Sequence, residues 1–310
     1  MKAPKIISSG GIGAELEVPR RQELIDRLDR ARSDAFGEEP RNADCAQEVW
    51  AALWLCSVDK LEGYVRQIEI SPASLAGESL YTTDVCNEII KPWLMAAAGA
   101  DSVLSMSADE EALERDGGQC IITEMGVGVE STHIYPYSLR SVSGPTCSRF
   151  WTALAMFWPP STIEERKRDV SGGGDTEHCA NRITLSPNAH AYWVRCLFAL
   201  KPVALSQDQK CLELEFHWLR SVPQSDTVLL TSKPSLLESL DGSVDNAGLF
   251  DPSTNSRILS GRKIWLETDD PVNQPLPSVK LLQLHWTMQR LAALSGALEI
   301  YNELNPSYDY

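Results

Sequence analysis

The side chains in this sequence best suited to chemistry are two histidines and an asparagine in its middle third. His133 stands in the segment THIYP, Asn181 begins the segment NRITL, and His190 follows in the segment SPNAH. An imidazole exchanges protons near neutral pH and binds metal ions, and an amide can orient it through hydrogen bonds. Each residue taken singly is typical of ordinary structural hydrogen bonding, so a site is indicated only by the context that the three share.

That context resembles a known motif. The segments CIITEMGVGVESTHIYPYSL and NRITLSPNAHAYWVRCLFALKP are similar to the His-Asn-His motif of the HNH nucleases, whose ββα-metal fold holds one divalent cation beside a general-base histidine. The resemblance implies that His133 ends a strand and deprotonates water. It implies that Asn181 fixes that imidazole or touches the metal, and that His190 comes off a short helix as a metal ligand. The three side chains would then converge in one pocket.

The resemblance reaches beyond the motif. The segment 261–299 is similar to the tail of many fungal proteins that carry this domain, so the similarity covers roughly residues 105 to 300. It implies an α+β fold, with a ββα-metal core between an N-terminal helical extension and a C-terminal extension of strands and a helix. We expect the corresponding domains at residues 1–104, 105–205 and 206–310.

Two positions depart from the nuclease pattern. Thr132 stands just before the expected base, where HNH nucleases usually have an aspartate or histidine as a metal ligand, and Val194 stands where a further acid or histidine is often found. If the site retains a metal, Mg²⁺ or Zn²⁺, its ligands would be Asn181 and His190. One imidazole and one neutral amide hold Mg²⁺ weakly, because that ion prefers carboxylate oxygens. Glu130 could replace the missing ligand, although a glutamate at a loop edge is usually solvated.

The charge of the chain disfavours a nucleic-acid partner. The net charge is −15, and basic and acidic residues balance within residues 112–205, so the motif region itself is neutral. A protein that grips a polyanion usually needs a cluster of lysines and arginines. The best such run, Arg166-Lys167-Arg168, has acidic neighbours on both sides and is typical of a solvated surface of mixed charge.

Three functions therefore remain open. The preferred one is an HNH scaffold that lost its metal and became a small-molecule enzyme of the cyclase or pericyclase type in fungal secondary metabolism. Such an enzyme needs no cofactor and would act on a small apolar or weakly polar substrate, with His133, Asn181, His190 and Tyr135 as catalytic hydrogen-bonding groups. The alternative is a divalent-metal-dependent HNH endonuclease. A non-catalytic protein-binding relic is the third.

Local patterns predict the elements that must position these residues. We expect a hairpin of two strands, 119–123 and 130–134, then a strand near 181–185. Ser186 and Pro187 are a good helix start, as N-cap and first residue, for a helix carrying His190. Further strands are expected at 211–217, 227–230 and 263–267, and a mobile insertion at 161–178. Helices are expected at 21–31, 46–58, 87–98, 107–116, 149–158 and along the apolar stripe 281–298.

The sequence gives less information about the cellular location and the oligomeric state of the protein. The eight cysteines include no CxxC pair, which indicates reduced thiols and no zinc ribbon. We expect neither a membrane-spanning helix nor a signal peptide, because no apolar run is long enough. A cytoplasmic location follows, or a nuclear one for the endonuclease, and the oligomeric state cannot be inferred.

Overall fold

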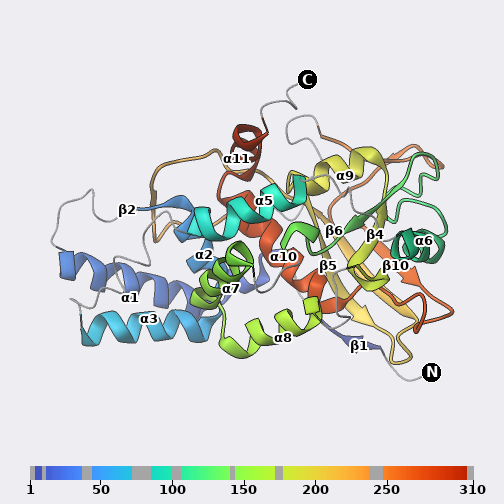
Figure 1. The fold of residues 1–310 in the computed structure, drawn as a ribbon. Coiled ribbons are helices and arrows are strands. Elements are labelled where there is room, and N and C mark those ends of the chain that lie inside the picture. Colours follow the sequence, from blue (N-terminus) through green and yellow to red (C-terminus); the bar gives the residue numbers. More distant parts are fainter. Residues whose placement is uncertain are drawn as a thin grey trace.

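The computed structural model describes residues 4–8, 12–36, 44–71, 85–98, 106–139, 144–171, 177–236 and 247–305. Helices and small antiparallel sheets are mixed along the chain, which confirms the mixed α and β class expected from the sequence. The helices of the first seventy residues lie at one end of the molecule and the main sheet lies at the other (Figure 1). No helix within the described ranges is both long and apolar enough to cross a bilayer.

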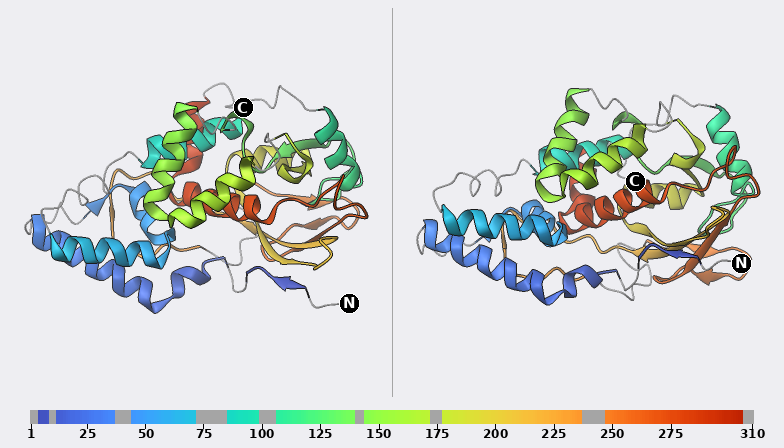
Figure 2. Two further views of the ribbon diagram at one scale, coloured as in Figure 1. Left: turned by 60° about the horizontal axis from the view of Figure 1, so that its bottom comes forward. Right: turned by 90° about the horizontal axis from the view of Figure 1, so that it is seen from below.

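Three helices form the N-terminal end. Helices α1 (Pro19–Phe36) and α3 (Val58–Ile70) run side by side (Figure 2), joined by ion pairs such as Arg27–Glu69 at 2.8 Å. Helix α2 (Gln47–Leu55) is apolar on every side, and all its residues are buried. The buried helix expected at 46–58 is α2, which ends at Leu55 because Ser57 caps the next helix, α3, by accepting a hydrogen bond from the Lys60 amide.

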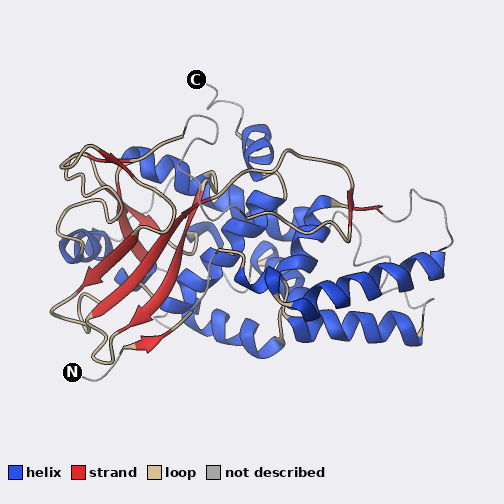
Figure 3. Cartoon of the chain, turned by 180° about the vertical axis from the view of Figure 1, so that it is seen from behind, coloured by secondary structure: helices blue, strands red, loops and turns tan. Residues whose placement is uncertain are grey.

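The main sheet has four antiparallel strands in the order β1-β5-β6-β10 (Figure 3). They are β1 (Lys5–Ile6), β5 (Phe198–Leu205), β6 (Cys211–Trp218) and β10 (Lys263–Glu267). The start of β5 escaped prediction because Pro202 disfavours a strand interior, and the chain accommodates this proline with an irregularity between Pro202 and Ala204. Strand β10 is an edge strand whose residues alternate between exposed and buried.

A separate two-stranded hairpin carries the sequence motif. Strand β3 (Glu130–His133) pairs with β4 (Arg182–Leu185), and α9 (Pro187–Val194) follows directly. The expected hairpin of 119–123 with 130–134 is wrong, since 119–123 is a loop. This loop lies on the other side of β4, where the Ile121 amide donates to the Thr184 carbonyl at 3.0 Å. The strand near 130–134 and the helix carrying His190 are confirmed.

Further helices pack around the hairpin, the main sheet and the N-terminal helices. They are α5 (Lys91–Ala98), α6 (Met106–Arg115), α7 (Pro145–Phe157), α8 (Pro160–Ser171), α10 (Val279–Leu294) and α11 (Ala297–Leu304). The mobile insertion expected at 161–178 is wrong for residues 161–171, because Ile163 and Val170 of α8 are buried in the core. The three glycines 172–174 lie outside the described residues.

One main apolar cluster runs through the molecule. It includes residues from all three expected domain ranges, from Leu16 to Ile300, and the boundary expected at residue 205 falls at the end of β5. The division into three domains stays a prediction.

Cysteines with described side chains are free, and all but Cys211 are buried. The short elements are η1 (Ala14–Glu17), β2 (Asp44–Cys45), η3 (Cys86–Ile90), η4 (Tyr137–Leu139), η5 (Cys179–Asn181), β7 (Val228–Leu229), β8 (Phe250–Asp251) and β9 (Ser256–Arg257).

Candidate functional site

The β3–β4 hairpin has two faces with different neighbours. Side chains alternate along a strand, so Glu130 and Thr132 point to one face and Ser131 and His133 to the other. In the register of the pair, His133 lies opposite Arg182. Helices α6 and α9 both contact the hairpin (Figure 1), and the side-chain bonds described next assign one helix to each face.

The face toward α6 holds a buried charge network. His133 Nε2 lies 2.8 Å from Glu177 Oε1, and the other oxygen of Glu177 accepts from Arg182 Nη2 at 2.6 Å. Arg182 also donates to Asp109 of α6. The Arg182 side chain is fully buried and that of His133 is 4% exposed, so this network is almost entirely removed from water.

A second arginine, Arg115, holds the backbone next to this network. Arg115, at the end of α6, donates to the carbonyls of Cys179, Arg182 and Pro275. Its neighbour Asp116 pairs with Arg115 at 2.8 Å and accepts from the Thr184 amide at 2.9 Å. Because these bonds tie α6 to β4 and to the chain before α10, they hold the backbone around Arg182 in place.

The face toward α9 holds a more open pair. His190 Nδ1 lies 2.7 Å from Glu130 Oε2, with side chains 24% and 53% exposed. Helix α9 begins as the sequence predicts, with Ser186 as N-cap and Pro187 in the first turn, and the His190 amide donates to the Ser186 carbonyl at 2.8 Å. His190 and Glu130 are therefore neighbours, which places the glutamate considered as a replacement ligand beside the last histidine.

Asn181 is engaged with the backbone of Tyr135. Its Oδ1 accepts from the Tyr135 amide at 2.8 Å, and its Nδ2 donates to the Tyr135 carbonyl at 3.0 Å. Asn181 is fully buried. The amide thus holds the chain where it leaves β3, and this geometry does not support its expected role as a metal ligand.

Tyr135 is also committed to structure. Its hydroxyl donates to the Leu139 carbonyl at 3.0 Å, and its ring is buried against Trp93 and Trp151. Burial, with Cys147 close to the hydroxyl, raises the pKa of Tyr135 well above its ordinary value. The geometry places this hydroxyl in the core, and it does not support the expected role as a donor to substrate.

The structure does not bring the motif residues into one pocket. His133 faces α6, His190 faces α9, and Asn181 binds backbone at the end of the hairpin. Within the part of the chain that is described, no three His, Cys, Asp or Glu side chains are placed to share a metal ion. Glu130 and His190 offer two donors, but on the face away from His133. The residues present therefore do not fit a centre in which one ion sits beside the base.

Three residues of this region were missed from the sequence. Glu177 and Asp109 hold Arg182, and Glu177 also holds His133. Arg182 directly follows Asn181, but a single arginine in a strand carries no signal of burial. Asp109 comes from a helix distant in sequence, and Glu177 lies in the loop five residues before Arg182, where nothing in the local sequence marks it as a partner of His133.

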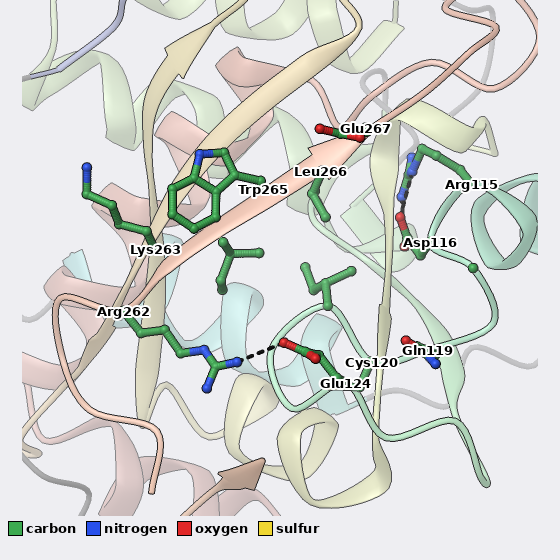
Figure 4. A pocket seen from close by; sticks show the side chains of 13 residues that line it. Arg115, Asp116, Gln119, Cys120, Glu124, Arg262, Lys263, Trp265, Leu266 and Glu267 are labelled. Carbon is green, nitrogen blue, oxygen red and sulfur yellow. Dashed lines mark hydrogen bonds and ion pairs between the residues drawn. The ribbon is translucent and has the colours of Figure 1, made fainter. Parts of the chain in front are cut away.

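A cavity lies beside this region, at the edge of the main sheet. It has a volume of about 590 Å³ and lies between the edge strand β10 and the loop 115–124, with Arg262 and Glu124 paired across one end at 2.9 Å (Figure 4). Trp265, 58% exposed, stands on β10 beside it. His133, Asn181 and His190 do not line this cavity.

Comparison with known proteins gives one family match. Residues 118–201 match a family model described as HNH endonuclease. The chain therefore carries an HNH-like domain in the region of the β3–β4 hairpin and α9. No curated protein and no solved structure matches the chain. The family match includes His133, Asn181 and His190, and it ends before β6.

Proposed function

We propose that the HNH-like domain works as a metal-independent acid–base catalyst on a small, neutral or weakly polar molecule, with cyclisation as the reaction class. The observation that carries the proposal is the Glu177 carboxylate shared between His133 and Arg182. A carboxylate that holds an imidazole fixes both its tautomer and its orientation, which is what a catalytic base requires. Where His133 Nε2 donates to this carboxylate, Nδ1 is the ring nitrogen whose lone pair can accept a proton.

The burial of this pair favours a small reactant. The His133 side chain is 4% exposed, so a molecule that reaches it is taken out of bulk water, where hydrogen bonds to developing charge are strengthened. The basic run on α8 is poorly placed to bind a polyanion, because its cations already contact other side chains. In the basic run on α8, Lys167 pairs with Glu164 at 3.0 Å and Arg166 lies over the Trp158 ring. The net charge of −15 acts in the same direction.

Comparative metabolite profiling tests this proposal. Cells producing the wild-type chain, His133→Ala and His190→Ala would be extracted and compared by mass spectrometry. We expect a small-molecule product that depends on His133 and persists with His190→Ala, because His190 is on the other face of the hairpin. A product that requires His190 as strictly as His133 would contradict the separation of roles.

Metal-dependent phosphodiester cleavage is the second candidate. The HNH endonuclease family match favours it, and so does the carboxylate beside His190. Plasmid DNA and RNA would be incubated with the protein and Mg²⁺, Mn²⁺ or Zn²⁺. We expect no cleavage above that of a His133→Ala sample. Nicking that needs the cation and disappears in His133→Ala would establish the endonuclease and overturn the first proposal.

A further inference from the structure

Strand β10 is an edge strand of the main sheet, and its hydrogen bonds show which of its residues face the neighbouring strand β6. The Phe216 amide donates to the Arg262 carbonyl at 2.9 Å, and the Thr268 amide donates to the Lys210 carbonyl at 3.0 Å. In an antiparallel pair, residues that bond to the neighbouring strand alternate with residues whose N–H and C=O groups point away from it. Every second residue, counted from Arg262, therefore bonds to β6.

The residues in between, Lys263, Trp265 and Glu267, turn their N–H and C=O groups to the open side of the sheet. Within the described ranges, no hydrogen bond reaches these groups from another residue. Their side chains lie on the exposed face, and the Trp265 ring at the centre of the strand is 58% exposed. An edge with free backbone groups and an exposed aromatic side chain is a template for a further strand.

The cavity of about 590 Å³ lies along this edge, with the loop 115–124 as its opposite wall (Figure 4). Every residue of β10 lines it, so the cavity accompanies the whole strand and not one side chain. Apolar side chains face each other across it, Leu266 from β10 and Ile121 from the loop. The volume is within the range of ligand sites. The edge strand therefore has space beside it for an extended chain.

The charges around the cavity indicate a basic partner. The cations on its walls already have carboxylate partners, at 2.6 to 2.9 Å: Arg115 with Asp116, Arg262 with Glu124 and Lys263 with Glu213. Glu267, exposed at the end of β10, has no ion pair among the described residues. A basic side chain placed opposite Glu267 would form one, and the net charge of −15 attracts a basic chain in the same direction.

We propose that the free edge of β10 binds an extended peptide segment of another protein as an additional antiparallel strand. A basic side chain of the peptide lies opposite Glu267, and a large apolar or aromatic one lies opposite Trp265, where cross-strand pairs stabilise a sheet. The loop across the cavity favours a single strand over a second copy of the chain, which would bring a whole sheet to this edge. The surface is independent of the reaction proposed at His133, because no motif residue lines it.

Fluorescence anisotropy with a dye-labelled peptide, acetyl-Lys-Val-Phe-Val-Thr-amide, tests strand addition. In the proposed register its lysine is opposite Glu267 and its phenylalanine opposite Trp265, and we expect saturable binding to the wild-type protein. A methyl group on the phenylalanine nitrogen removes an N–H that donates to β10, so it should weaken binding by about tenfold or more. A methyl group on the nitrogen of the following valine is the matched control. That N–H points away from β10, so affinity should stay within about threefold of the parent peptide.

Protein variants test the charged contact. Glu267→Gln should weaken binding of the lysine peptide by about two- to fivefold, as for an exposed ion pair, and leave unchanged the binding of a peptide with threonine in place of lysine. Glu303→Gln, exposed on α11, is the charge-matched control and should bind both peptides as the wild type does. Circular dichroism checks that each variant is folded.

Four results would overturn the proposal. They are a wild-type protein that does not bind the lysine peptide, two methylated peptides that bind equally well, and a folded Glu267→Gln protein that binds the lysine peptide like the wild type. The fourth is a wild-type dimer in analytical ultracentrifugation that Trp265→Glu dissociates, since the edge would then belong to a second copy of the chain.

Discussion

The two faces of the β3–β4 hairpin carry nearly the same interaction in different surroundings. On the face toward α6, His133 and Glu177 are 2.8 Å apart, and on the face toward α9, His190 and Glu130 are 2.7 Å apart. The first pair is almost fully buried and tied to Arg182, whereas the second is half in water. Removing one member of a buried ion pair leaves an uncompensated charge, while exposed pairs contribute little. Their surroundings, rather than their distances, give the two pairs different roles.

The same contrast separates two tasks that the HNH motif normally combines. The base and the last histidine belong together in an HNH centre, and here the strand alternation of β3 turns His133 away from Glu130 and His190. The α6 face therefore suits a fixed base that works without a metal. The α9 face offers two possible ligands, Glu130 and His190, which would bind a cation weakly.

Replacing Arg182 should have the largest effect. Arg182→Met removes the guanidinium from between Asp109 and Glu177 and leaves two poorly solvated carboxylates without their cation. We expect a loss of about 3–5 kcal/mol in the free energy of unfolding. Urea denaturation followed by circular dichroism measures it.

An exposed pair provides the control. Arg149→Met removes the surface ion pair between Arg149 and Glu88, in which the Arg149 side chain is 63% exposed. It should change the free energy of unfolding by less than about 1 kcal/mol. Equal losses in Arg182→Met and Arg149→Met would show that burial does not distinguish the α6 face.

Replacing Asn181 should come next. Asn181→Ala removes both hydrogen bonds to the Tyr135 backbone and leaves that amide and carbonyl buried, which should cost about 2 kcal/mol. Asn188→Ala, exposed on α9, is the matched control and should be nearly neutral. Two results together would contradict this role. They are an Asn181→Ala protein as stable as the control, and a divalent cation that stabilises the wild type but not Asn181→Ala. The amide would then be a metal ligand and not a group that holds the backbone.

The inner side of α9 should show a pH dependence. Trp193 of α9 stacks on His285 with ring centroids 3.6 Å apart, and burial lowers the pKa of His285 well below the ordinary value of 6.5. The unfolded chain then binds a proton near pH 6.5 that the folded chain does not bind. Stability is therefore lost as pH falls below about 6.5, by up to roughly 1.4 kcal/mol per pH unit.

His285→Phe keeps a ring against Trp193 and removes this titration. Unfolding free energies of both proteins would be measured at pH 7.5, 6.5 and 5.5, so that other titrating groups cancel in the difference. The wild type should lose more stability than the variant between pH 6.5 and 5.5. Parallel curves would mean that His285 is protonated equally in both states.

The smallest effect is expected on the α9 face. His190→Ala removes a partly exposed pair and should change the free energy of unfolding by less than about 0.5 kcal/mol. High salt should change it little further. A loss above about 2 kcal/mol in the same urea assay would place His190 in a network as tight as that of His133.

The sequence predicts local features of this region well. The helix start at Ser186 and Pro187, the strand ending at His133 and the strands β6 and β10 all follow from residues close together in the chain. The alternation that separates Glu130 from His133 is also contained in the sequence. The motif resemblance implies one pocket, whereas this alternation sends the side chains of His133 and Glu130 to opposite faces of the hairpin.

The partners of the strands and of the buried charges could not be predicted from local sequence patterns. Strand β3 pairs with β4 across a long intervening stretch that contains α7 and α8, whereas the sequence pattern predicts the nearer segment 119–123 as its partner. Asp109 reaches Arg182, and Glu177 reaches His133, only in the folded chain, and nothing in their local sequence marks them. Non-local contacts of this kind need the structure, because periodicity reports which face a residue occupies and not what covers that face.

A crystal structure of the protein soaked with Mn²⁺ tests the separation of the two histidines most directly. The anomalous signal of the ion locates it without assumptions about activity. Any manganese near the motif should bind Glu130 and His190 on the α9 face, with His133 still held by Glu177 on the other side of the hairpin. A single ion bound by Asn181 and His190 with the His133 imidazole beside it would contradict the account and restore the nuclease centre.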